Sequence, residues 1–354
     1  LIVILIFGGI QMKSNNYLMD EISQNAPMKK DFNYLDKHYG GVRPFEAAIQ
    51  LKDKNADFWD KETLQQLEKL EENLEEEYGV LIKFSLVKTV KLINRSSHAG
   101  RTDYYSIPDQ QRIINRFQKP IKRAGRGKLY AGFMDSIGTT SRISGTIPDW
   151  GNIKITAKNK KFTEYLKTSG LDKIVDVQIT GTAHLLDKNI NYLSASLVKG
   201  LSVSVLIVAL VMGLLYRSVS MVVLSIIPNL IPLLFIAGIM GYFGINLKTS
   251  TSIIFTIAFG IAVDDTIHFL GKFKFELLKG RSKLYALKRS YLTTGKAMII
   301  TTFILCAGFI LLVFSSFQGT VIMGLLLCLT LFIALIADLT LLPVLLMLFY
   351  RKGK

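Results

Sequence analysis

Cysteine is scarce in this sequence. Two of the 354 residues are cysteine, Cys306 and Cys328, and both lie in strongly apolar stretches. The polar region between residues 13 and 195 contains none, so a disulfide framework is excluded there. Two thiols inside apolar helices do not indicate a cellular compartment.

Several chemical motifs are also missing. The phosphate-binding pattern Gly-x-x-x-x-Gly-Lys-Ser/Thr does not occur, so the sequence offers no visible site for ATP. Neither a nucleophile paired with a general base nor the spacing of metal ligands is recognisable. The sequence therefore predicts neither an enzyme nor a bound cofactor or metal.

Acidic residues are nearly absent from the second half of the chain. Of the 27 Asp and Glu residues, 23 lie between Asp20 and Asp187, while the apolar residues are concentrated after Leu197. The acidic residues beyond that point are Asp264, Asp265, Glu276 and Asp338. This segregation, with half of all residues hydrophobic, predicts a membrane protein with one large water-soluble insert.

The net charge of +16 does not indicate nucleic-acid binding, because many basic residues flank the apolar runs. From Leu197 onward there are 14 Lys and Arg residues, and eight of them lie between Lys272 and Lys296. Basic clusters beside membrane helices mark the cytoplasmic side and attract anionic lipid headgroups. We therefore expect membrane lipids as partners and no nucleic acid.

Five apolar runs are long enough to cross a bilayer as helices, which takes about 20 residues each. They cover residues 196–216, 219–243, 249–271, 295–315 and 320–349. Residues 1–12 are too few to span, and we expect them to be the outer half of a truncated helix of a longer protein. Alternate loops are basic, which places the C-terminus and residues 272–294 in the cytoplasm. The predicted protein is a multi-pass protein of the cell (inner) membrane with an extracytoplasmic domain at 13–195 and a five-span bundle at 196–354.

Strand and helix patterns alternate in the region 13–195. Helices are predicted at 58–78, 107–124 and 158–168 from the spacing of apolar residues. Strands are predicted at 42–51, 80–87, 128–134, 143–157 and 173–180. Two rounds of strand, helix and strand predict two small α+β sandwiches. The acidic run from Glu68 to Glu77 is expected to be a solvated helix face.

The run at 249–271 carries an unusual polar ridge. Positions four apart share one face of a helix, and here that face is small or polar from end to end. The ridge consists of Ser252, Thr256, Gly260, Asp264 and His268, with Asp265 beside it. Charges at membrane depth are rare and usually face a protein interior or a water path. We expect a proton or cation relay; the alternative is a packing seam with a carboxylate near the interface.

Three further runs carry polar or helix-breaking residues. The prolines of the second run, Pro228 and Pro232, form either a hinge or cavity lining, or a tolerated kink. The threonines of the fourth run, Thr301 and Thr302, either hydrogen-bond their own helix or face the two aspartates. The residues are Pro228, Asn229 and Pro232 in the second run, Thr301 and Thr302 in the fourth, and Asp338 with Pro343 in the fifth.

Together these motifs resemble the RND (resistance-nodulation-division) superfamily, in particular its predicted-exporter or MMPL branch, which is related to Patched, Dispatched and the sterol-sensing proteins. The motifs are Ile227-Pro228-Asn229, Gly260-x-x-x-Asp264-Asp265-x-x-His268, Thr301-Thr302 and Asp338-Leu-x-Leu-Leu-Pro343. The resemblance covers nearly the whole chain. It implies a membrane α-helical bundle of about six spans, the first truncated, plus an extracytoplasmic α+β porter-like domain of two ferredoxin-like subdomains.

The resemblance also implies a function. It implies a secondary active transporter that exports lipids or other hydrophobic molecules, driven by a proton or sodium gradient and by no other cofactor. The implied relay residues are Asp264, Asp265, His268, Thr301 and Thr302. The implied packing or hinge residues are Gly260, Pro228, Asn229 and Pro232, with Asp338 in a secondary role.

The implied partners are the missing N-terminal half of the transporter, a homo-oligomer, or other envelope proteins. Two alternative functions stay open. The first is a lipid- or sterol-sensing membrane protein without transport, and the second is a Sec D/F-like accessory of protein export. The two aspartates and the histidine favour transport over sensing, because a sensor does not need an acidic relay.

Overall fold

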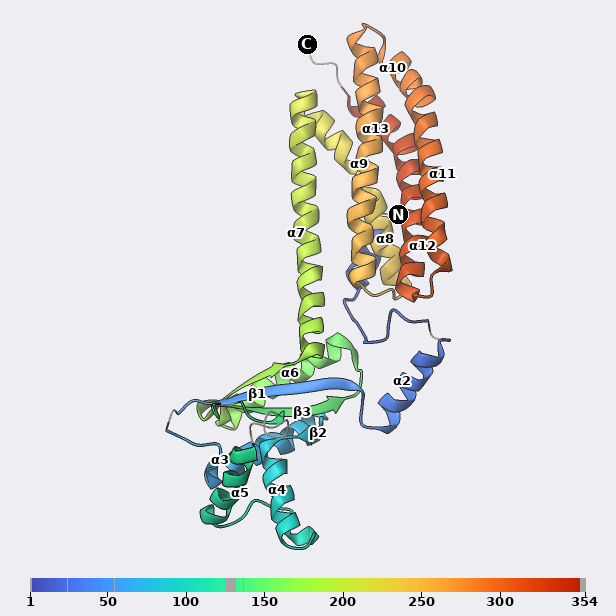
Figure 1. Cartoon of the computed structure of the whole chain (residues 1–354). Coiled ribbons are helices and arrows are strands. Elements are labelled where there is room, and N and C mark those ends of the chain that lie inside the picture. Colours follow the sequence, from blue (N-terminus) through green and yellow to red (C-terminus); the bar gives the residue numbers. More distant parts are fainter. Residues whose placement is uncertain (1, 24, 54, 125–131, 136, 351–354) are drawn as a thin grey trace. The chain divides into compact units, whose positions relative to one another are not determined.

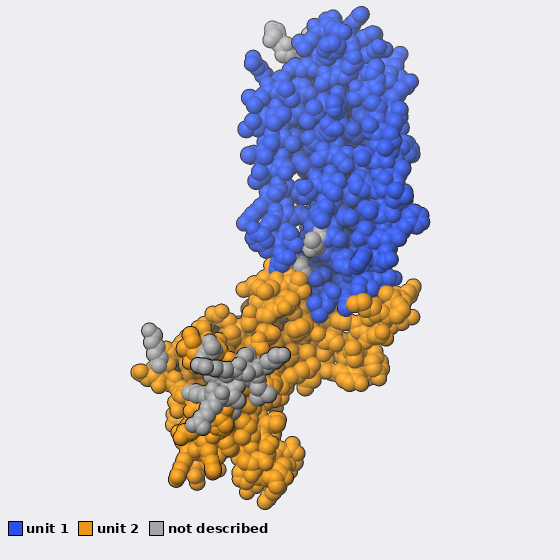
Figure 2. Space-filling view, in the orientation of Figure 1, with its two compact units in different colours: residues 1–24, 189–354 blue, residues 25–188 orange. Residues whose placement is uncertain are grey.

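The computed structural model describes residues 2–23, 25–53, 55–124, 132–135 and 137–350. They form two compact units, which Figure 2 shows in different colours. The helical unit contains residues 1–24 and 189–354, and the mixed unit contains residues 25–188. Most of the strand predicted at 128–134 and the basic residues 351–354 lie outside the described residues.

The helical unit contains the spans that the apolar runs predicted. Among the described residues, five helical segments of this unit are long and apolar enough to cross a membrane, so the chain is a multi-pass membrane protein. The helices of this unit (Figure 1) are α1 (Ile2–Gln11), α7 (Thr182–Tyr216), which begins in the mixed unit, α8 (Val219–Tyr242), α9 (Thr249–Leu278), α10 (Lys283–Ser290), α11 (Lys296–Ile310), α12 (Gln318–Ile336) and α13 (Leu342–Phe349). Single π-helical turns, Tyr291–Gly295 and Ala337–Leu341, join α10 to α11 and α12 to α13.

The basic segment 272–294, predicted as a loop, is largely helical. Helix α9 continues to Leu278, and α10 begins at Lys283. One reason is an ion pair between Lys272 and Glu276 at 3.0 Å, four residues apart on α9. The third and fourth spans are therefore longer than their apolar runs.

Helix α9 is central to the packing of the helical unit. Its Phe269 and Phe273 lie in one buried cluster with Met212 of α7 and Leu342 of α13. Its Phe259 lies in a second cluster with residues of α8 and α12. By contrast, the apolar spans of α7 and of α10–α11 are mostly exposed within this chain. Their outer faces are the surfaces that lipid can cover.

The short helix α1 packs against α8 through glycines. A Cβ atom built on Gly241 would lie 1.7 Å from the carbonyl oxygen of Gly8. A Cβ atom on Gly238 would lie about as close to Leu5 as heavy atoms can approach, at 3.0 Å. Residues without side chains thus allow the two backbones to touch, as is common between membrane helices.

The residues that follow α1 bind two loops of the same unit, and we call residues 13–22 the strap. The backbone N–H of Leu247 donates to Lys13 O at 2.8 Å, and that of Gln318 donates to Glu21 O at 2.7 Å. The Glu21 carboxylate also accepts from the hydroxyl of Ser250 at 3.1 Å. The strap thus connects the α8–α9 loop with the α11–α12 loop.

The mixed unit is built on an antiparallel sheet with strand order β2-β3-β1-β4. Its strands are β1 (Arg43–Leu51), β2 (Leu81–Phe84), β3 (Thr140–Ile147) and β4 (Val175–Thr180). Its helices are α2 (Pro27–His38), α3 (Lys61–Asn73), α4 (Leu86–Ser97), α5 (Gln111–Ala124) and α6 (Gly151–Thr168). The sequence predicted two sheets, whereas the described residues of this unit hold one four-stranded sheet. The reason is that β1 pairs with both β3 and β4 and so joins the two rounds of strands.

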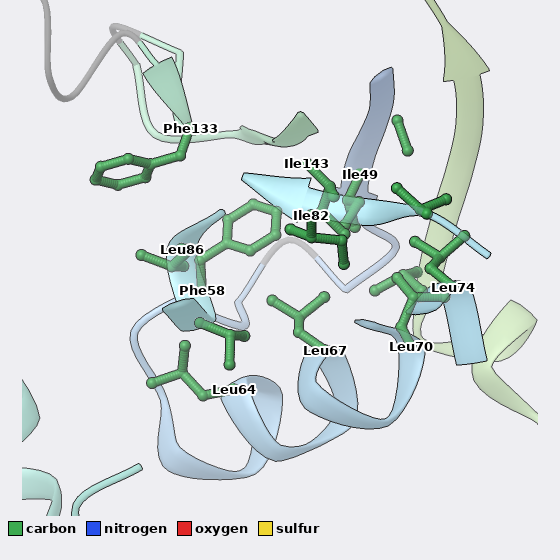
Figure 3. Close-up of a cluster of buried hydrophobic side chains, with 14 of the residues drawn as sticks. Ile49, Phe58, Leu64, Leu67, Leu70, Leu74, Ile82, Leu86, Phe133 and Ile143 are labelled. Atoms are coloured by element: carbon green, nitrogen blue, oxygen red, sulfur yellow. The ribbon is translucent and has the colours of Figure 1, made fainter. Parts of the chain in front are cut away.

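The core of the mixed unit packs α3 against the sheet (Figure 3). Side chains on β1 alternate between buried and partly exposed, as expected for a strand with one face on a core. The buried side chains of α3 and of the π turn that continues it repeat every three or four residues, which confirms the predicted helix. These core residues are Phe45, Ala47 and Ile49 of β1 and Leu64, Leu67, Leu70 and Leu74 of α3 and its π turn.

Two predicted strands are too long, and in each case a helix replaces the end of the strand. Strand β2 ends at Phe84, because the hydroxyl of Ser85 accepts a hydrogen bond from the backbone N–H of Lys88 at 3.0 Å and caps α4. Strand β3 ends before Pro148, which has no N–H to continue the ladder, and α6 begins at Gly151. Both regions are rich in β-branched residues, so local pattern alone favoured strand.

The prediction of a solvated acidic face on α3 is wrong at Glu71. This side chain is 6% exposed and hydrogen-bonds with the hydroxyl of Ser85. Burial raises the pKa of Glu71 to about 8, although Ser85 and the nearby Lys88 and Lys91 oppose the shift. Near neutral pH, the carboxyl group of Glu71 is therefore largely protonated in the folded protein.

This burial predicts that the mixed unit loses stability as the pH rises. The carboxyl ionises near its ordinary pKa of 4.5 when unfolded, so the free energy of unfolding should fall between about pH 4.5 and 8. Glu71→Gln should remove this fall, which amounts to at most a few kcal/mol, whereas Glu72→Gln at an exposed position should not. Tryptophan fluorescence reports the unfolding, because both tryptophans, Trp59 and Trp150, lie in this unit. An unchanged pH dependence in Glu71→Gln would contradict the assignment.

A methyl group at Gly241 should separate α1 from α8. Its Cβ would overlap the carbonyl oxygen of Gly8, so Gly241→Ala should destabilise the contact by about 1–3 kcal/mol. Gly308→Ala in α11 is the matched control, because no atom lies within 4 Å of the position of its Cβ. Limited proteolysis of the strap, with the protein reconstituted into nanodiscs, measures the effect as faster cleavage of Gly241→Ala. Equal cleavage rates in the two variants would show that the close approach is not needed.

Candidate functional site

An open groove runs along one side of α9 in the helical unit. Its volume is about 1230 Å³, and α9, α11 and the π turn before α11 supply its walls. Most of the lining is apolar or small. The charged and polar residues of the lining include Asp264, Asp265, His268, Lys272 and Thr301.

Part of the polar ridge predicted on α9 lies along this groove. Gly260, Asp264 and His268 line it, four residues apart on one face. Nε2 of His268 lies 3.4 Å from Oδ1 of Asp264, so a protonated imidazole would form an ion pair with the carboxylate. Both side chains are largely exposed, 68% for His268 and 72% for Asp264. Ser252, at the other end of the ridge, is buried by neighbouring residues instead.

The other predicted relay residues divide between the groove and the interior. Asp265 is half-buried at the wall of the groove. Thr301 also lines the groove, but its hydroxyl donates within α11, with Ala297 O at 3.1 Å and Met298 O at 3.0 Å. Thr302 is buried and is not part of the lining. The single hydroxyl hydrogen of Thr301 is thus donated within its own helix and not toward Asp264 or Asp265.

A second polar site is buried in the bundle, on the opposite face of α9 from Asp264. Oγ1 of Thr266 lies 2.8 Å from Oδ1 of Asp338 and 3.1 Å from Oδ1 of Asn229. Asn229 belongs to α8, Thr266 to α9, and Asp338 to the π turn between α12 and α13. None of the three is more than 1% exposed, so bulk water does not solvate them.

This network has enough hydrogen atoms to form both contacts of Thr266 as hydrogen bonds when Asp338 is protonated. Nδ2 of Asn229 donates to the carbonyl oxygen of Ser225 at 2.7 Å, which leaves the amide oxygen, an acceptor, facing Thr266. A carboxylate is an acceptor too, and Thr266 has one hydroxyl hydrogen for both. Both contacts are hydrogen bonds at once if Asp338 donates to Thr266 and Thr266 donates to Asn229. The other oxygen of Asp338 is buried without a hydrogen-bond partner among the described residues, which also favours a neutral carboxyl group.

The prolines predicted to form a hinge lie beside this network. Pro228 and Pro232 are buried within α8, which is continuous from Val219 to Tyr242. Asn229 follows Pro228 directly, so the Pro-Asn motif places an amide in the interior of the bundle. The structure therefore gives Asn229 a definite contact, while the hinge role of the prolines stays a prediction.

Thr266 is the residue that the sequence analysis missed. It lies two residues from both Asp264 and His268, about 200° around the helix, so the ridge excluded it. A threonine in an apolar helix is not in itself a signal, because its hydroxyl can bond its own backbone. The available signal was the combination of isolated polar residues on separate spans, Asn229 and Asp338, which need a common partner when buried.

Comparison with known proteins identifies the membrane region. The model of the MMPL family matches residues 158–353, which is more than half of the chain and includes both the groove and the buried network. The chain is also similar to "Putative membrane protein MJ1562" of Methanocaldococcus jannaschii, with 22% identity over 358 residues. That similarity covers 98% of this chain and 88% of the Methanocaldococcus protein, so the two are of similar length.

The buried network predicts which threonine hydroxyl stabilises the bundle. Thr266→Val keeps the shape but leaves Asn229 and Asp338 without their shared partner, and an unpaired buried polar group costs about 1–3 kcal/mol. Thr266→Ser should retain most of the stability. Thr330→Val is the matched control, because Thr330 is equally buried but donates to Leu326 O of its own helix. Thermal unfolding of helix in nanodiscs, followed by circular dichroism, measures the difference; equal losses for the two valine variants would refute the bridging role.

Proposed function

The chain belongs to the MMPL family, a part of the RND superfamily, and we propose that it is a proton-driven exporter of hydrophobic molecules. Members of this family are transporters rather than enzymes. In the proposal the protein lies in the cytoplasmic membrane, with residues 13–195 outside the cytoplasm, as the basic alternate loops indicate. The observation that carries the proposal is the buried carboxyl group of Asp338.

Asp338 has the properties of a proton-binding group. When its carboxyl group is protonated, it can donate to Thr266 while Thr266 donates to Asn229. The side chain is buried in the bundle, away from bulk water. Loss of the proton would leave a buried negative charge with one hydroxyl donor. Such a charge is unstable unless the structure around it changes. Protonation of Asp338 is thus coupled to the arrangement of its neighbours.

The groove supplies a route for protons to this group. Asp264 and His268 are exposed in the groove and can exchange protons there. Asp265 lies at the wall of the groove and directly precedes Thr266, whose hydroxyl contacts Asp338. We propose that protons pass from Asp264 and His268 through Asp265 to Asp338.

The network links proton movement to helix movement. When Asp338 is ionised, the Thr266 hydroxyl turns to the carboxylate and no longer donates to Asn229. The amide oxygen of Asn229 on α8 then lacks its donor, which weakens the contact between α8 and α9. Because the interior is densely packed, such a change favours a second discrete arrangement rather than a gradual drift.

The groove also supports a hydrophobic substrate. Its apolar lining includes Ile261, Ile267, Phe275, Ile304 and Leu305. Its volume of about 1230 Å³ exceeds the roughly 300–1,000 Å³ of a typical small-molecule site, so a large hydrophobic molecule would fit. Lys272, also in the lining, would suit an anionic headgroup at the cytoplasmic end.

Infrared spectroscopy tests the proton site directly. At neutral pH the reconstituted protein should show the carbonyl band of a protonated carboxylic acid in a Glu71→Gln background, which removes the carboxyl group of Glu71, also largely protonated at this pH. Asp338→Asn should abolish this band, Thr266→Val should shift it, and Asp264→Asn should leave it. A band that persists in Asp338→Asn, or no band at all, would overturn the assignment.

Vesicles with an imposed gradient test the driving ion and the transport. A pH gradient should drive a fluorescent phospholipid between leaflets, and an equal sodium gradient should not. Asp265→Asn and Asp338→Asn should each slow the movement about 100-fold, as loss of a proton-transfer group does. Thr330→Val should transport at the rate of the unmodified protein. Movement driven by sodium alone, or full rates in both Asn variants, would contradict proton coupling.

A further inference from the structure

A pocket in the mixed unit combines lysine side chains with buried aromatic rings. Its walls come from α6 and from the π turn Leu74–Tyr78, which continues α3, and its volume is about 490 Å³. Sites for small molecules typically have volumes of roughly 300–1,000 Å³. Tyr78 and Phe162 are buried and form the inner side of the pocket, with their ring centres 6.1 Å apart.

Three lysines of α6 surround this aromatic inner side. Lys154, Lys158 and Lys161 all line the pocket, and their spacing of four and three residues places them on one face of the helix. Like charges at such spacing destabilise a helix. With Glu77 as the one carboxylate, the described lining carries a net charge of +2. The sequence thus concentrates positive charge here at a cost to the stability of α6.

Lys158 is at the centre of this cluster. Its Nζ donates to Glu77 O at 2.9 Å and lies 4.6 Å from the centre of the Trp150 ring, as does Nζ of Lys154. Burial and the positive charges of Lys154 and Lys161 lower the pKa of Lys158, although Glu77 opposes the shift. An anion bound among the three ammonium groups would relieve this repulsion.

We propose that this pocket binds a phosphate monoester joined to an apolar body. Such a group carries a charge of about −1.5 to −2 near neutral pH, which matches the lining, whereas a carboxylate or a phosphodiester carries about −1. Lysine ammonium groups bind phosphate oxygens as compact charges. The aromatic inner side receives the apolar body. The proposal goes beyond the proposed function, because the pocket shares no residue with the groove or with the network of Asp338.

Calorimetric titration with phenyl phosphate tests the site, with the complete chain in nanodiscs of zwitterionic lipid. Phenyl sulfate is the matched control, since it has a similar shape but a single charge, and it should bind at least about tenfold more weakly. The affinity for phenyl phosphate should rise between about pH 5 and 7, because its second proton leaves near pH 6. The affinity for phenyl sulfate should stay constant over this range.

Substitutions on α6 locate the binding. Lys158→Gln should weaken the binding of phenyl phosphate at least about tenfold, because a charge-assisted hydrogen bond is lost. Lys160→Gln is the matched control, since Lys160 is exposed on the same helix but does not line the pocket, and it should leave the affinity unchanged. Circular dichroism should show equal helix content in both variants. If Lys158→Gln fails to fold, Lys154→Gln, at an exposed position, should still weaken binding several-fold.

Nanodiscs that contain phosphatidic acid distinguish a lipid headgroup from a soluble ligand. A lower apparent affinity for phenyl phosphate in these nanodiscs, with no such loss in phosphatidylglycerol, would identify a lipid with a phosphate monoester as the occupant. An unchanged affinity would identify a soluble compound, and the site stands in either case. Equal affinities for phenyl phosphate and phenyl sulfate, or equal affinities in Lys158→Gln and Lys160→Gln, would overturn the proposal.

Discussion

Inside the helical unit, one hydroxyl group lies between two oxygen atoms in a place that water does not reach. Thr266 holds a hydrogen bond with Asp338 and another with Asn229, and each of the three belongs to a different helical segment. Because the hydroxyl has a single hydrogen, the protonation of the carboxyl group determines the direction of both bonds. Under the proposed function, the positions of α8, α9 and the α12–α13 turn depend on this one proton.

Helix α9 has two polar faces with different properties. The face with Asp264 and His268 opens to the groove, whereas the face with Thr266 is sealed within the bundle. Asp265 lies between them at the wall of the groove. In the proposed function, the exposed face receives the proton and the sealed face contacts the group that stores it.

The sequence predicts well what depends on residues close together along the chain. Apolar runs predict the spans, and four-residue spacing predicts that Asp264 and His268 share a face, because both follow from helix geometry. It predicts less well what depends on distant pairing. The single sheet, the burial of Glu71 and the contact of Thr266 with Asn229 each require a neighbour from elsewhere in the chain. No local pattern contains that information.

The strap restricts how this protein can vary in length. Loops between helices usually tolerate insertions, because few contacts depend on their exact path. Here Leu247, in the loop after α8, and Gln318, the first residue after the loop before α12, hydrogen-bond to the backbone of the strap at Lys13 and Glu21. An insertion in either loop would shift one anchor relative to the other. Natural length variation among relatives should therefore avoid these two loops, although loops elsewhere in the bundle remain free to change.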